Sequence, residues 1–529
     1  MPRRTPVRLV SVLLVAAVGL SAIVGGLIRA ALYEPPAVAA VPAAGGGTPG
    51  TCGGVPTTAT RELRGMWLTT VNNGDFPSRP GLPPDAVKAE YLRWVDLAVA
   101  EHYNAVFVHV RPSGDAFWPS RYAPWSYWLT GRRDGAGPGW DPMAFMVAEA
   151  HRRNLEFHAW FNPYKATQSG PSGTGTDVQK LPAGHPLRAH PDWAVAYPKG
   201  AYGQLYFDPG NADARRFVED SILEAVRLYD VDGVHFDDFF YPYPVAGQDF
   251  PDAASYAKRT RAAQSRADWR RANVDVFVHE LSVRIKQVKP WVQFGVSPFG
   301  IWRNRDHDPD GSDTHGLQSY DAIYADTRKW VRRGWLDYIA PQLYWPIGFA
   351  KADYARLVPW WSAQVEGTGV RLYIGMADYR VGEPGPWRDP AQLDKQLTLN
   401  AKYPVSGVIH FSARHVRADK LGAVTRYRNA HDAEPALPPR PRTPAAPPGE
   451  PRLVSPRSAG HGTVTVDWQR GPGPAPVSWA LYRVQRSAAR LVATGRVDAA
   501  LPAMGAGVYC LTTLDRSGNE GTPSVPFTA

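Results

Sequence analysis

Residues 232–244, DGVHFDDFFYPYP, join a short apolar run to two adjacent carboxylates and then to four aromatic rings. The run GVHF has the length and the bounding turn residue of a buried β-strand. Polar side chains directly after such a strand are typical of parallel α/β folds, whose sites lie at the carboxyl ends of their strands. The stretch therefore predicts a strand whose end, at Asp237 and Asp238, contributes to a functional site.

Seven further apolar runs share this character, and each is followed by an irregular segment and then by a helical pattern. They occupy residues 63–70, 105–110, 156–161, 292–298, 337–345, 371–376 and 406–413. Amphipathic stretches such as 211–229 lie between them, with apolar residues at three- and four-residue intervals. Strand runs alternating with helices over residues 61–431 predict a (β/α)8 TIM barrel. A doubly wound open sheet is the alternative, weakened by the strand count and by the lack of a glycine-rich loop after the first run.

The N-terminal flank has the composition of an export segment. Basic residues precede an apolar run at 9–28, and small residues follow it. Residues 1–40 are predicted to be a signal peptide or, because about 20 apolar residues suffice to span a bilayer, an uncleaved N-terminal membrane anchor. Residues 41–60 read as a flexible linker. We expect the remainder of the chain to be secreted or extracytoplasmic in either case.

The C-terminal flank predicts a second, smaller domain. Residues 432–450 form a proline-rich linker, and residues 451–529 alternate as short strands between turn residues. This pattern resembles a small all-β fibronectin type III sandwich, with Trp468 as its buried core ring and Tyr509 at the tyrosine corner. The chain has two cysteines, Cys52 and Cys510, and the sequence leaves open whether they pair.

The charge balance argues against a nucleic-acid partner. The chain has 59 basic and 49 acidic side chains, a net charge of +10, and much of the excess lies in residues 1–8 and 438–448. That distribution favours orientation at a membrane, and the sequence has neither a basic helix nor a nucleic-acid-binding fingerprint.

The predicted strand ends present the side chains expected of a sugar site. Aromatic rings stack on the apolar faces of pyranoses, while polar groups bond the hydroxyls. The candidate substrate-binding residues are Trp67, Arg111, Asn162, Tyr164, His235, Tyr241, Gln342, Tyr344, Trp345 and His410. Lys165, Tyr379 and Ser412 also follow strands. A polysaccharide is therefore the expected partner.

The carboxylates identify candidate catalytic residues, because glycoside cleavage needs two carboxyl groups. Strand ends supply Asp115, the pair Asp237 and Asp238, and Asp378. Alternation along a strand places Asp237 in the barrel lumen if His235 faces it, and turns Asp238 away. Asp238 then orients a neighbour or raises the pKa of Asp237 through like charge. The partner of Asp237 is expected on another strand, at Asp115 or Asp378.

Each of these features also has a structural interpretation. Asp238 can be structural, and His235 can be a satisfied histidine of the barrel interior. A metal site built from His235, Asp237 and His410 lacks diagnostic spacing, so the sequence predicts neither a metal nor another cofactor.

Four segments are similar to the bacterial glycosyl-hydrolase-like family 10: LYFDPGNADAR, YDVDGVHFDDFFYP, KPWVQFGVSPFGIWRN and DYIAPQLYWPIG. The resemblance covers roughly residues 60–425. It implies an envelope-anchored or secreted (β/α)8 glycosidase of the type that cleaves peptidoglycan strands lacking stem peptides. The motif residues carried over are Asp237, Asp238, Arg111, Asp115, Asn162, Gln342 and Tyr344.

The fourth strand also resembles, distantly, the DGxDxDxE signature of chitinase-type barrels. Asp232, Gly233 and Asp237 match it, but His235 and Phe239 stand where the signature has acids. This departure argues against assuming the chitinase mechanism, in which a substrate N-acetyl group assists.

Two functions remain open. The first is an exported glycoside hydrolase acting on cell-wall glycan or a related N-acetylated polysaccharide. The second is a non-catalytic wall-binding protein that holds glycan in the same aromatic groove.

Overall fold

The computed structural model describes residues 50–168, 175–259, 264–440, 445–460 and 463–529. The predicted signal peptide or anchor, residues 1–40, lies outside this part of the chain. In the part described, none of the helices is both long and apolar enough to cross a bilayer.

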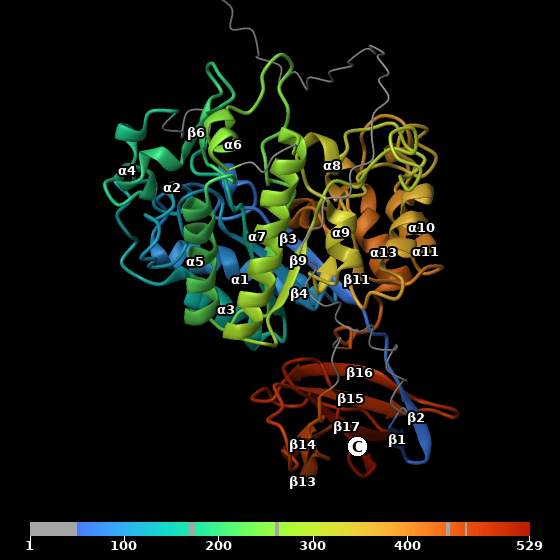
Figure 1. Cartoon of the computed structure of the whole chain (residues 1–529). Helices are drawn as coiled ribbons and strands as arrows, with labels where there is room; N and C mark the ends of the chain where they lie inside the picture. The colour runs from blue at the N-terminus through green and yellow to red at the C-terminus, as the bar shows by residue number, and fades with distance from the viewer. Residues whose placement is uncertain (1–49, 169–174, 260–263, 441–444, 461–462) are drawn as a thin grey trace, which may run out of the picture. The chain divides into compact units, whose positions relative to one another are not determined.

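Eight parallel strands close into a barrel (Figure 1). Each barrel strand pairs with the barrel strand that precedes it and the one that follows it along the chain, and the last, β12, pairs with the first, β3. They are β3 (Leu63–Leu68), β4 (Ala105–Arg111), β5 (Glu156–Phe161), β8 (Gly233–Phe236), β9 (Gln293–Val296), β10 (Tyr338–Ile339), β11 (Arg371–Met376) and β12 (Val405–His410). The predicted (β/α)8 barrel is confirmed.

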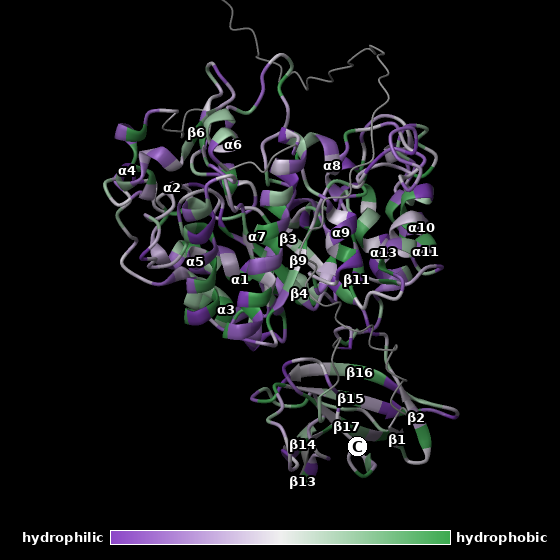
Figure 2. Cartoon of the chain, in the orientation of Figure 1, coloured by the Kyte–Doolittle hydropathy of each residue, from purple (hydrophilic) through white to green (hydrophobic). Residues whose placement is uncertain are grey.

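A helix follows each strand. The main ones are α1 (Pro84–Ala100), α3 (Pro142–Arg152), α5 (Ala212–Leu228), α7 (Arg266–Val288), α9 (Thr327–Arg332), α10 (Tyr354–Val365), α11 (Gln392–Asn400) and α13 (Ala423–His431). Shorter ones are α2 (Tyr127–Thr130), α4 (Pro186–Ala189), α6 (Ala253–Arg259), α8 (Ser319–Ala322) and α12 (Ala413–Ala418). Side-chain caps fix several starts: Asn211 accepts from the Asp213 and Ala214 amides, and Ser265 from the Asp268 amide. The helices carry green apolar and purple polar sides (Figure 2).

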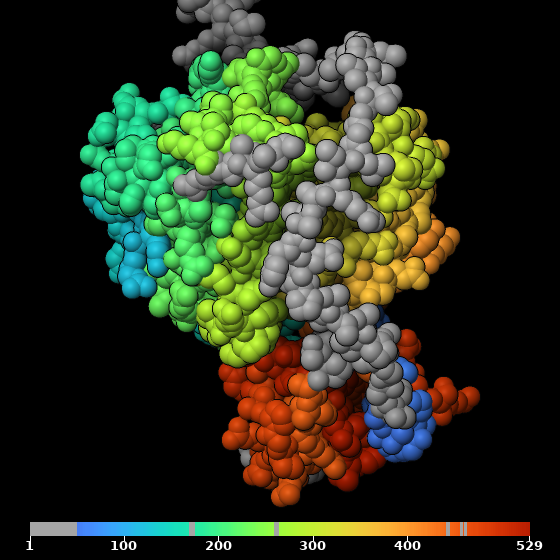
Figure 3. Space-filling model, viewed as in Figure 1, coloured from blue at the N-terminus to red at the C-terminus, as the bar shows by residue number. Residues whose placement is uncertain are grey.

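Alternation along the strands creates two cores. Residues such as Val106, Val108 and Phe236 pack under the helices, whereas Phe107, Trp160 and Tyr338 fill the barrel lumen. Side chains fill the gaps between the ribbons of Figure 1, as the space-filling view shows (Figure 3). The lumen is crowded: a Cβ on Gly233 would lie 2.1 Å from His158 Nδ1. The glycine that opens GVHF is therefore required by close approach to a neighbouring ring.

The segment after β5 is the enlarged loop that borders the site. It contains the antiparallel hairpin β6 (Ala194–Tyr197) and β7 (Gln204–Phe207). Lys165 forms an antiparallel bridge with Tyr206 of this hairpin. The hairpin thereby fixes the chain that follows Asn162.

The C-terminal region is all β and includes strands from the other end of the chain. Its larger sheet has the order β1-β2-β16-β15-β17-β18, beside a two-stranded β13-β14 sheet. The strands are β1 (Thr51–Cys52), β2 (Val55–Thr58), β13 (Arg452–Gly460), β14 (Thr463–Gln469), β15 (Ser478–Val484), β16 (Ala489–Arg496), β17 (Val508–Leu514) and β18 (Phe527–Thr528).

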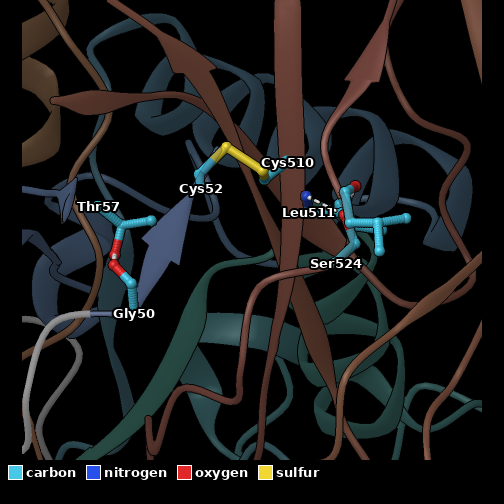
Figure 4. The surroundings of a disulfide bond; sticks show 7 residues. Gly50, Cys52, Thr57, Cys510, Leu511 and Ser524 are labelled. Atoms are coloured by element: carbon cyan, nitrogen blue, oxygen red, sulfur yellow. Dashed lines mark hydrogen bonds between the residues drawn. A yellow bond between two sulfur atoms is a disulfide. The ribbon is translucent and has the colours of Figure 1, made fainter. Parts of the chain in front are cut away.

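The segment expected to be a flexible linker, residues 41–60, thus contains two strands. β2 pairs in parallel with β16, through Thr57 opposite Ala489. Cys52 and Cys510 form a disulfide between β1 and β17, which answers the question left open by the sequence (Figure 4). Composition alone misses this because the pairing partner lies more than 400 residues away.

The fibronectin type III resemblance remains a prediction. The Tyr509 hydroxyl donates to the Gly505 carbonyl at 2.9 Å, the bond expected of a tyrosine corner. Trp468 is only partly buried, however, and the buried ring of that core is Trp479. Leu437, from the predicted proline-rich linker, packs into the region's other core beside Cys52.

Candidate active site

Asp237 stands just beyond the end of β8, and its carboxylate is held from β5. Asn162 Nδ2 donates to both carboxylate oxygens at 2.6 Å, and Trp160 Nε1 donates to Oδ2 at 3.2 Å. The Phe239 amide adds a bond to Oδ1 at 3.1 Å. Because Trp160 packs in the lumen core, Asp237 lies at the lumen mouth, as alternation predicts.

Asp238 is held by a different set of donors. Gln342 Nε2 donates to its Oδ1 at 2.9 Å and to the Ser297 carbonyl at the same distance. The Tyr243 hydroxyl donates to Oδ2. Asp238 therefore faces β9, β10 and its own loop, whereas Asp237 faces β5.

Burial and mutual repulsion raise the pKa values of this pair. Both carboxyls are more than nine-tenths buried. Burial, and next the charge of Asp238, raise the pKa of Asp237 to about 7. Burial likewise raises the pKa of Asp238, opposed by its bonds from Tyr243 and Gln342. Asp237 is consequently partly protonated near neutral pH, beside a second buried carboxyl.

Lys165 supplies the positive charge of the site. Its ammonium lies 4.4 Å from the centre of the Phe239 ring, and its charge lowers the pKa of both aspartates. Burial lowers the pKa of Lys165 itself, against the opposing effect of the two carboxylates. Asp237, Asp238 and Lys165 thus form one electrostatic unit.

His109 pairs in register with Trp160 and faces the lumen beside it, and it was not among the predicted residues. Its ring stacks on Trp160 with the centroids 4.0 Å apart, and it is 1% exposed. Burial and then Lys165 lower its pKa, so the imidazole is neutral. Strand alternation from Phe107 would have found it, because both residues face the lumen.

Aromatic rings near the carboxylate pair form two groups. Phe239, Tyr243 and Phe299 form one, with successive centroids 5.0 and 5.3 Å apart. Tyr344, Tyr379 and Phe411 form the other, with centroids within 6.0 Å of one another. Tyr243 and Tyr379 are among the large side chains that remain exposed. Exposed rings of this kind offer stacking surfaces for sugars, and the Tyr243 hydroxyl bonds to Asp238.

Comparison with known proteins gives the family. The model of glycosyl hydrolase-like 10 matches residues 62–392. The chain is 47% identical over 385 residues to glycosyl hydrolase YngK of Bacillus subtilis (strain 168), covering 72% of this chain and 74% of that protein. It is 40% identical over 411 residues to glycosyl hydrolase DigH of Escherichia coli (strain K12), covering 74% and 91%.

The chain belongs to the glycosyl hydrolase-like 10 family. Among solved structures, the glycoside hydrolase domain of PgaB (BpsB) from Bordetella bronchiseptica aligns with a TM-score of 0.43 and 14% identity, over 70% of this chain and 98% of that one. The matched range of the glycosyl hydrolase-like 10 model includes β3 to β11 and both aspartates.

Two predicted substrate-binding residues of this glycosyl hydrolase-like 10 barrel are closed inside its core. Trp67 is 2% exposed and donates from Nε1 to His235 Nε2 at 3.0 Å. His235 Nδ1 lies 3.0 Å from the Tyr338 hydroxyl, so both ring nitrogens are satisfied. They face the lumen one layer below Asp237, and the structural interpretation of His235 is the right one.

Asp378 and His410 bond to each other away from the lumen. His410 Nδ1 lies 2.9 Å from the Asp378 carboxylate, and His410 stacks between Tyr103 and Tyr427 under the helices. His410 has the opposite alternation to Ile409, which packs in the lumen core. The prediction that Asp378 partners Asp237 is therefore wrong, and His410 does not line the site.

Asp115 and Arg111 lie at the end of β4, and in the part of the chain that the structure describes their hydrogen bonds go to Ser113 and to the Pro163 carbonyl instead of to Asp237 or Asp238. The Ser113 amide and hydroxyl both donate to Asp115 Oδ1 at 3.0 Å. Asp115 lines a separate cavity with Trp125, Tyr127, Arg132 and Arg133. Arg111 is fully buried beneath this loop, where burial lowers its pKa to about 10.

Three of the aromatic residues that were predicted to bind substrate pack away from the aspartate pair. Tyr164 is fully buried against Phe277 of α7. Tyr241 is 1% exposed and packs on Phe250 and Tyr324. Trp345 is half-buried beside Gly300. Of the predicted set, the structure gathers Asp237, Asp238, Asn162 and Gln342 through direct hydrogen bonds, with Tyr344 beside them.

The candidate metal set does not assemble, because His235 and His410 are engaged as described above. Within the described ranges, no group of three or more His, Cys, Asp or Glu side chains is placed to hold a metal ion. The groups that the structure brings together at this position are the two carboxyls and the side chains that bond to them, Asn162, Trp160, Gln342 and Tyr243.

Proposed function

We propose that this protein is an exported glycoside hydrolase that cleaves glycosidic bonds in cell-wall glycan, either peptidoglycan strands or a related N-acetylated polysaccharide. The observation that carries the proposal is the buried pair Asp237 and Asp238, of which Asp237 has a pKa raised to about 7 and Asp238 bonds to the partly exposed Tyr243. A carboxyl that is protonated at neutral pH can serve as the general acid that glycoside cleavage requires.

The family and the disulfide support this proposal. YngK and DigH both carry the name glycosyl hydrolase. The Cys52–Cys510 bond suits an oxidising compartment, which agrees with the expected export signal or membrane anchor in residues 1–40.

The test is hydrolysis of peptidoglycan whose stem peptides have been removed by an amidase, with products followed by mass spectrometry. We expect shortened glycan from the wild type, and at least a 100-fold lower rate from Asp237→Asn and from Asp238→Asn. Asp85→Asn, the same chemical change at an exposed position of α1, is the matched control. Intact glycan with the wild type would contradict the proposal.

The second candidate function is glycan binding without cleavage. It is favoured by one observation: Asp378, expected to complete a catalytic pair from another strand, is bonded to His410 instead. Wild-type protein that sediments with the stripped glycan and leaves it uncut would support this function.

A further inference from the structure

We propose that His109 is a positioning residue of the candidate site, which fixes the two side chains that hold Asp237. It lies beside Trp160 and Asn162, and both of these donate hydrogen bonds to the Asp237 carboxylate. In the described part of the chain His109 makes no hydrogen bond to Asp237 itself, so it acts through these neighbours. The kinetic part of this inference rests on the proposed function, whereas its spectroscopic part does not.

The first contact is with the indole of Trp160. His109 of β4 pairs in register with Trp160 of β5, and their rings stack with centroids 4.0 Å apart and planes 10° from parallel. The same indole donates from Nε1 to Asp237 Oδ2 at 3.2 Å. A ring packed flat against the indole restricts its rotation, and the direction of this hydrogen bond depends on that rotation.

The second contact is with the side chain of Asn162. Because its Nδ2 donates to both oxygens of Asp237 at 2.6 Å, its amide oxygen must be directed elsewhere. Burial and Lys165 lower the pKa of His109, and the Asn162 side chain opposes them, as an acceptor does that faces a ring N–H. The two groups do not meet hydrogen-bond geometry in this structure, and bonds of this kind commonly tighten when substrate binds. A ring N–H on this side would keep Nδ2 of the amide directed to Asp237.

The nitrogens of His109 are not needed for packing. The side chain is 1% exposed, and neither ring nitrogen has a hydrogen-bond partner among the described residues. A buried polar atom without a partner destabilises a fold, whereas phenylalanine would fill a similar space and stack on Trp160 without that cost. Stability alone would therefore favour phenylalanine at this position, and a polar group that opposes stability is typical of a functional site.

His235 provides the contrast. It also pairs in register with Trp160, from β8. Its Nε2 accepts from Trp67 Nε1 at 3.0 Å, and its Nδ1 lies 3.0 Å from the Tyr338 hydroxyl. The nitrogens of His235 are thus used within the barrel, whereas those of His109 are available to the groups around Asp237.

The neutral state of His109 suits this role. A second positive charge beside Asp237, in addition to Lys165, would lower the pKa of that carboxyl and oppose its protonation near pH 7. The titratable groups that act on Asp237 or His109 are Asp238, Lys165, His235, Tyr243 and Tyr344.

Substitutions separate the ring from its nitrogens. His109→Phe keeps a flat ring against Trp160 and removes the nitrogens, whereas His109→Gln keeps an N–H donor and removes the ring. His235→Phe is the same change at a lumen histidine whose two bonds are lost. We expect His109→Phe to have a thermal midpoint equal to or above that of the wild type, and His235→Phe a lower one. A midpoint for His109→Phe as low as that of His235→Phe would mean that the nitrogens serve the fold, and would overturn the inference.

The Trp160 indole N–H reports on Asp237 without any substrate. In protein labelled with 15N at the tryptophan indoles, its NMR resonance is the one lost in Trp160→Phe. Because this N–H bonds to Asp237, we expect the resonance to titrate with a midpoint near the Asp237 pKa of about 7. In His109→Phe the Asn162 amide favours the ionised carboxylate less, so the midpoint should rise by about half a pH unit. An unchanged midpoint would overturn the inference and leave the proposed function standing.

Kinetics on amidase-stripped glycan give the second readout. We expect His109→Phe to lower kcat about 10-fold with KM within about threefold of the wild type, and His109→Gln to recover part of the loss. His315→Phe, the same change at an exposed position, should match the wild type. Equal kcat for the wild type and His109→Phe would overturn the inference. An inactive wild type would contradict the proposed function, and the Trp160 titration would still decide the role of His109.

Discussion

Asp237 experiences opposing effects at the scale of one residue. Four hydrogen bonds from Asn162, Trp160 and the Phe239 amide favour its charged form, while burial and Asp238 disfavour it. The raised pKa shows that burial and repulsion prevail. Such a group is poised for proton transfer, at a cost to the stability of the folded chain at higher pH.

The pH dependence of unfolding tests this balance. Asp237 has a folded pKa of about 7 against about 3.9 unfolded, so its stabilising contribution is present below pH 4 and lost as the pH rises through 7. Relative to Asp237→Asn, the wild type should lose up to about 4 kcal/mol of unfolding free energy between pH 4 and pH 8. The unfolding free energies of both proteins would be measured by chemical denaturation at each pH. A difference between wild type and Asp237→Asn that stays constant with pH would refute the raised pKa.

Lys165 allows a second test at this scale. Lys165→Met removes a charge that favours both ionised aspartates, so the pKa of the pair should rise further. We expect the alkaline limb of the kcat/KM profile on stripped glycan to move up by about one pH unit. Lys165→Arg keeps the charge and should leave the limb nearly in place. A shift toward lower pH in Lys165→Met would contradict this assignment.

At the scale of the strand, alternation determines which side a residue faces but not how deep it lies. The alternation of side chains along β8 correctly places His235 and Asp237 on the lumen side. His235 is nevertheless closed off, because its neighbours in register, Trp160 and Gly295, belong to the same filled layer. Depth follows from the register between strands, which a single strand's sequence does not contain.

Beyond the strand ends, alternation no longer applies. Asp378 belongs to the short 3-10 helix Asp378–Arg380, which turns its carboxylate toward His410. Tyr164 and Tyr241 similarly follow strands and pack outward against helix and loop side chains. The strand pattern therefore predicted the barrel, whereas most of the candidate residues expected around Asp237 and Asp238 lie elsewhere, because the turns after the strands set the directions of their side chains.

Asp378→Asn tests this reassignment. The variant weakens buried bonds to His410 Nδ1 and, at 3.4 Å, to the Tyr427 hydroxyl. We expect a loss of about 1–3 kcal/mol in unfolding free energy, with kcat on stripped glycan within about twofold of the wild type. A loss of kcat comparable to that of Asp237→Asn, in protein that remains folded, would return Asp378 to the catalytic set.

At the scale of the molecule, the C-terminal sheet is built from both ends of the described chain. β1 and β2 extend the edge at β16, and Cys52 bonds to Cys510 of β17. Around this disulfide, Thr57 bonds to Gly50 and Leu511 to Ser524 (Figure 4). Strand patterns predicted the sheet's own strands, but no local pattern identifies a strand donated from another part of the sequence.

Removing the disulfide should destabilise this sheet. We expect Cys52→Ser combined with Cys510→Ser to lower the stability of the C-terminal region by about 2–5 kcal/mol. Calorimetry and limited proteolysis with mapped cleavage sites would measure the change. The wild type in reducing agent should reproduce it. Equal resistance of β1, β2 and β16 to protease in both proteins would contradict a stabilising role.

The donated strands also impose an order on biosynthesis. Cys52 and β2 are made before the barrel, whereas their partners β16 and Cys510 are made after it. The C-terminal sheet can therefore be completed only after the whole barrel sequence has been translated. A chain truncated before Cys510 keeps an unpaired thiol and an unpaired strand edge, the features by which quality control and aggregation distinguish incomplete proteins from finished ones.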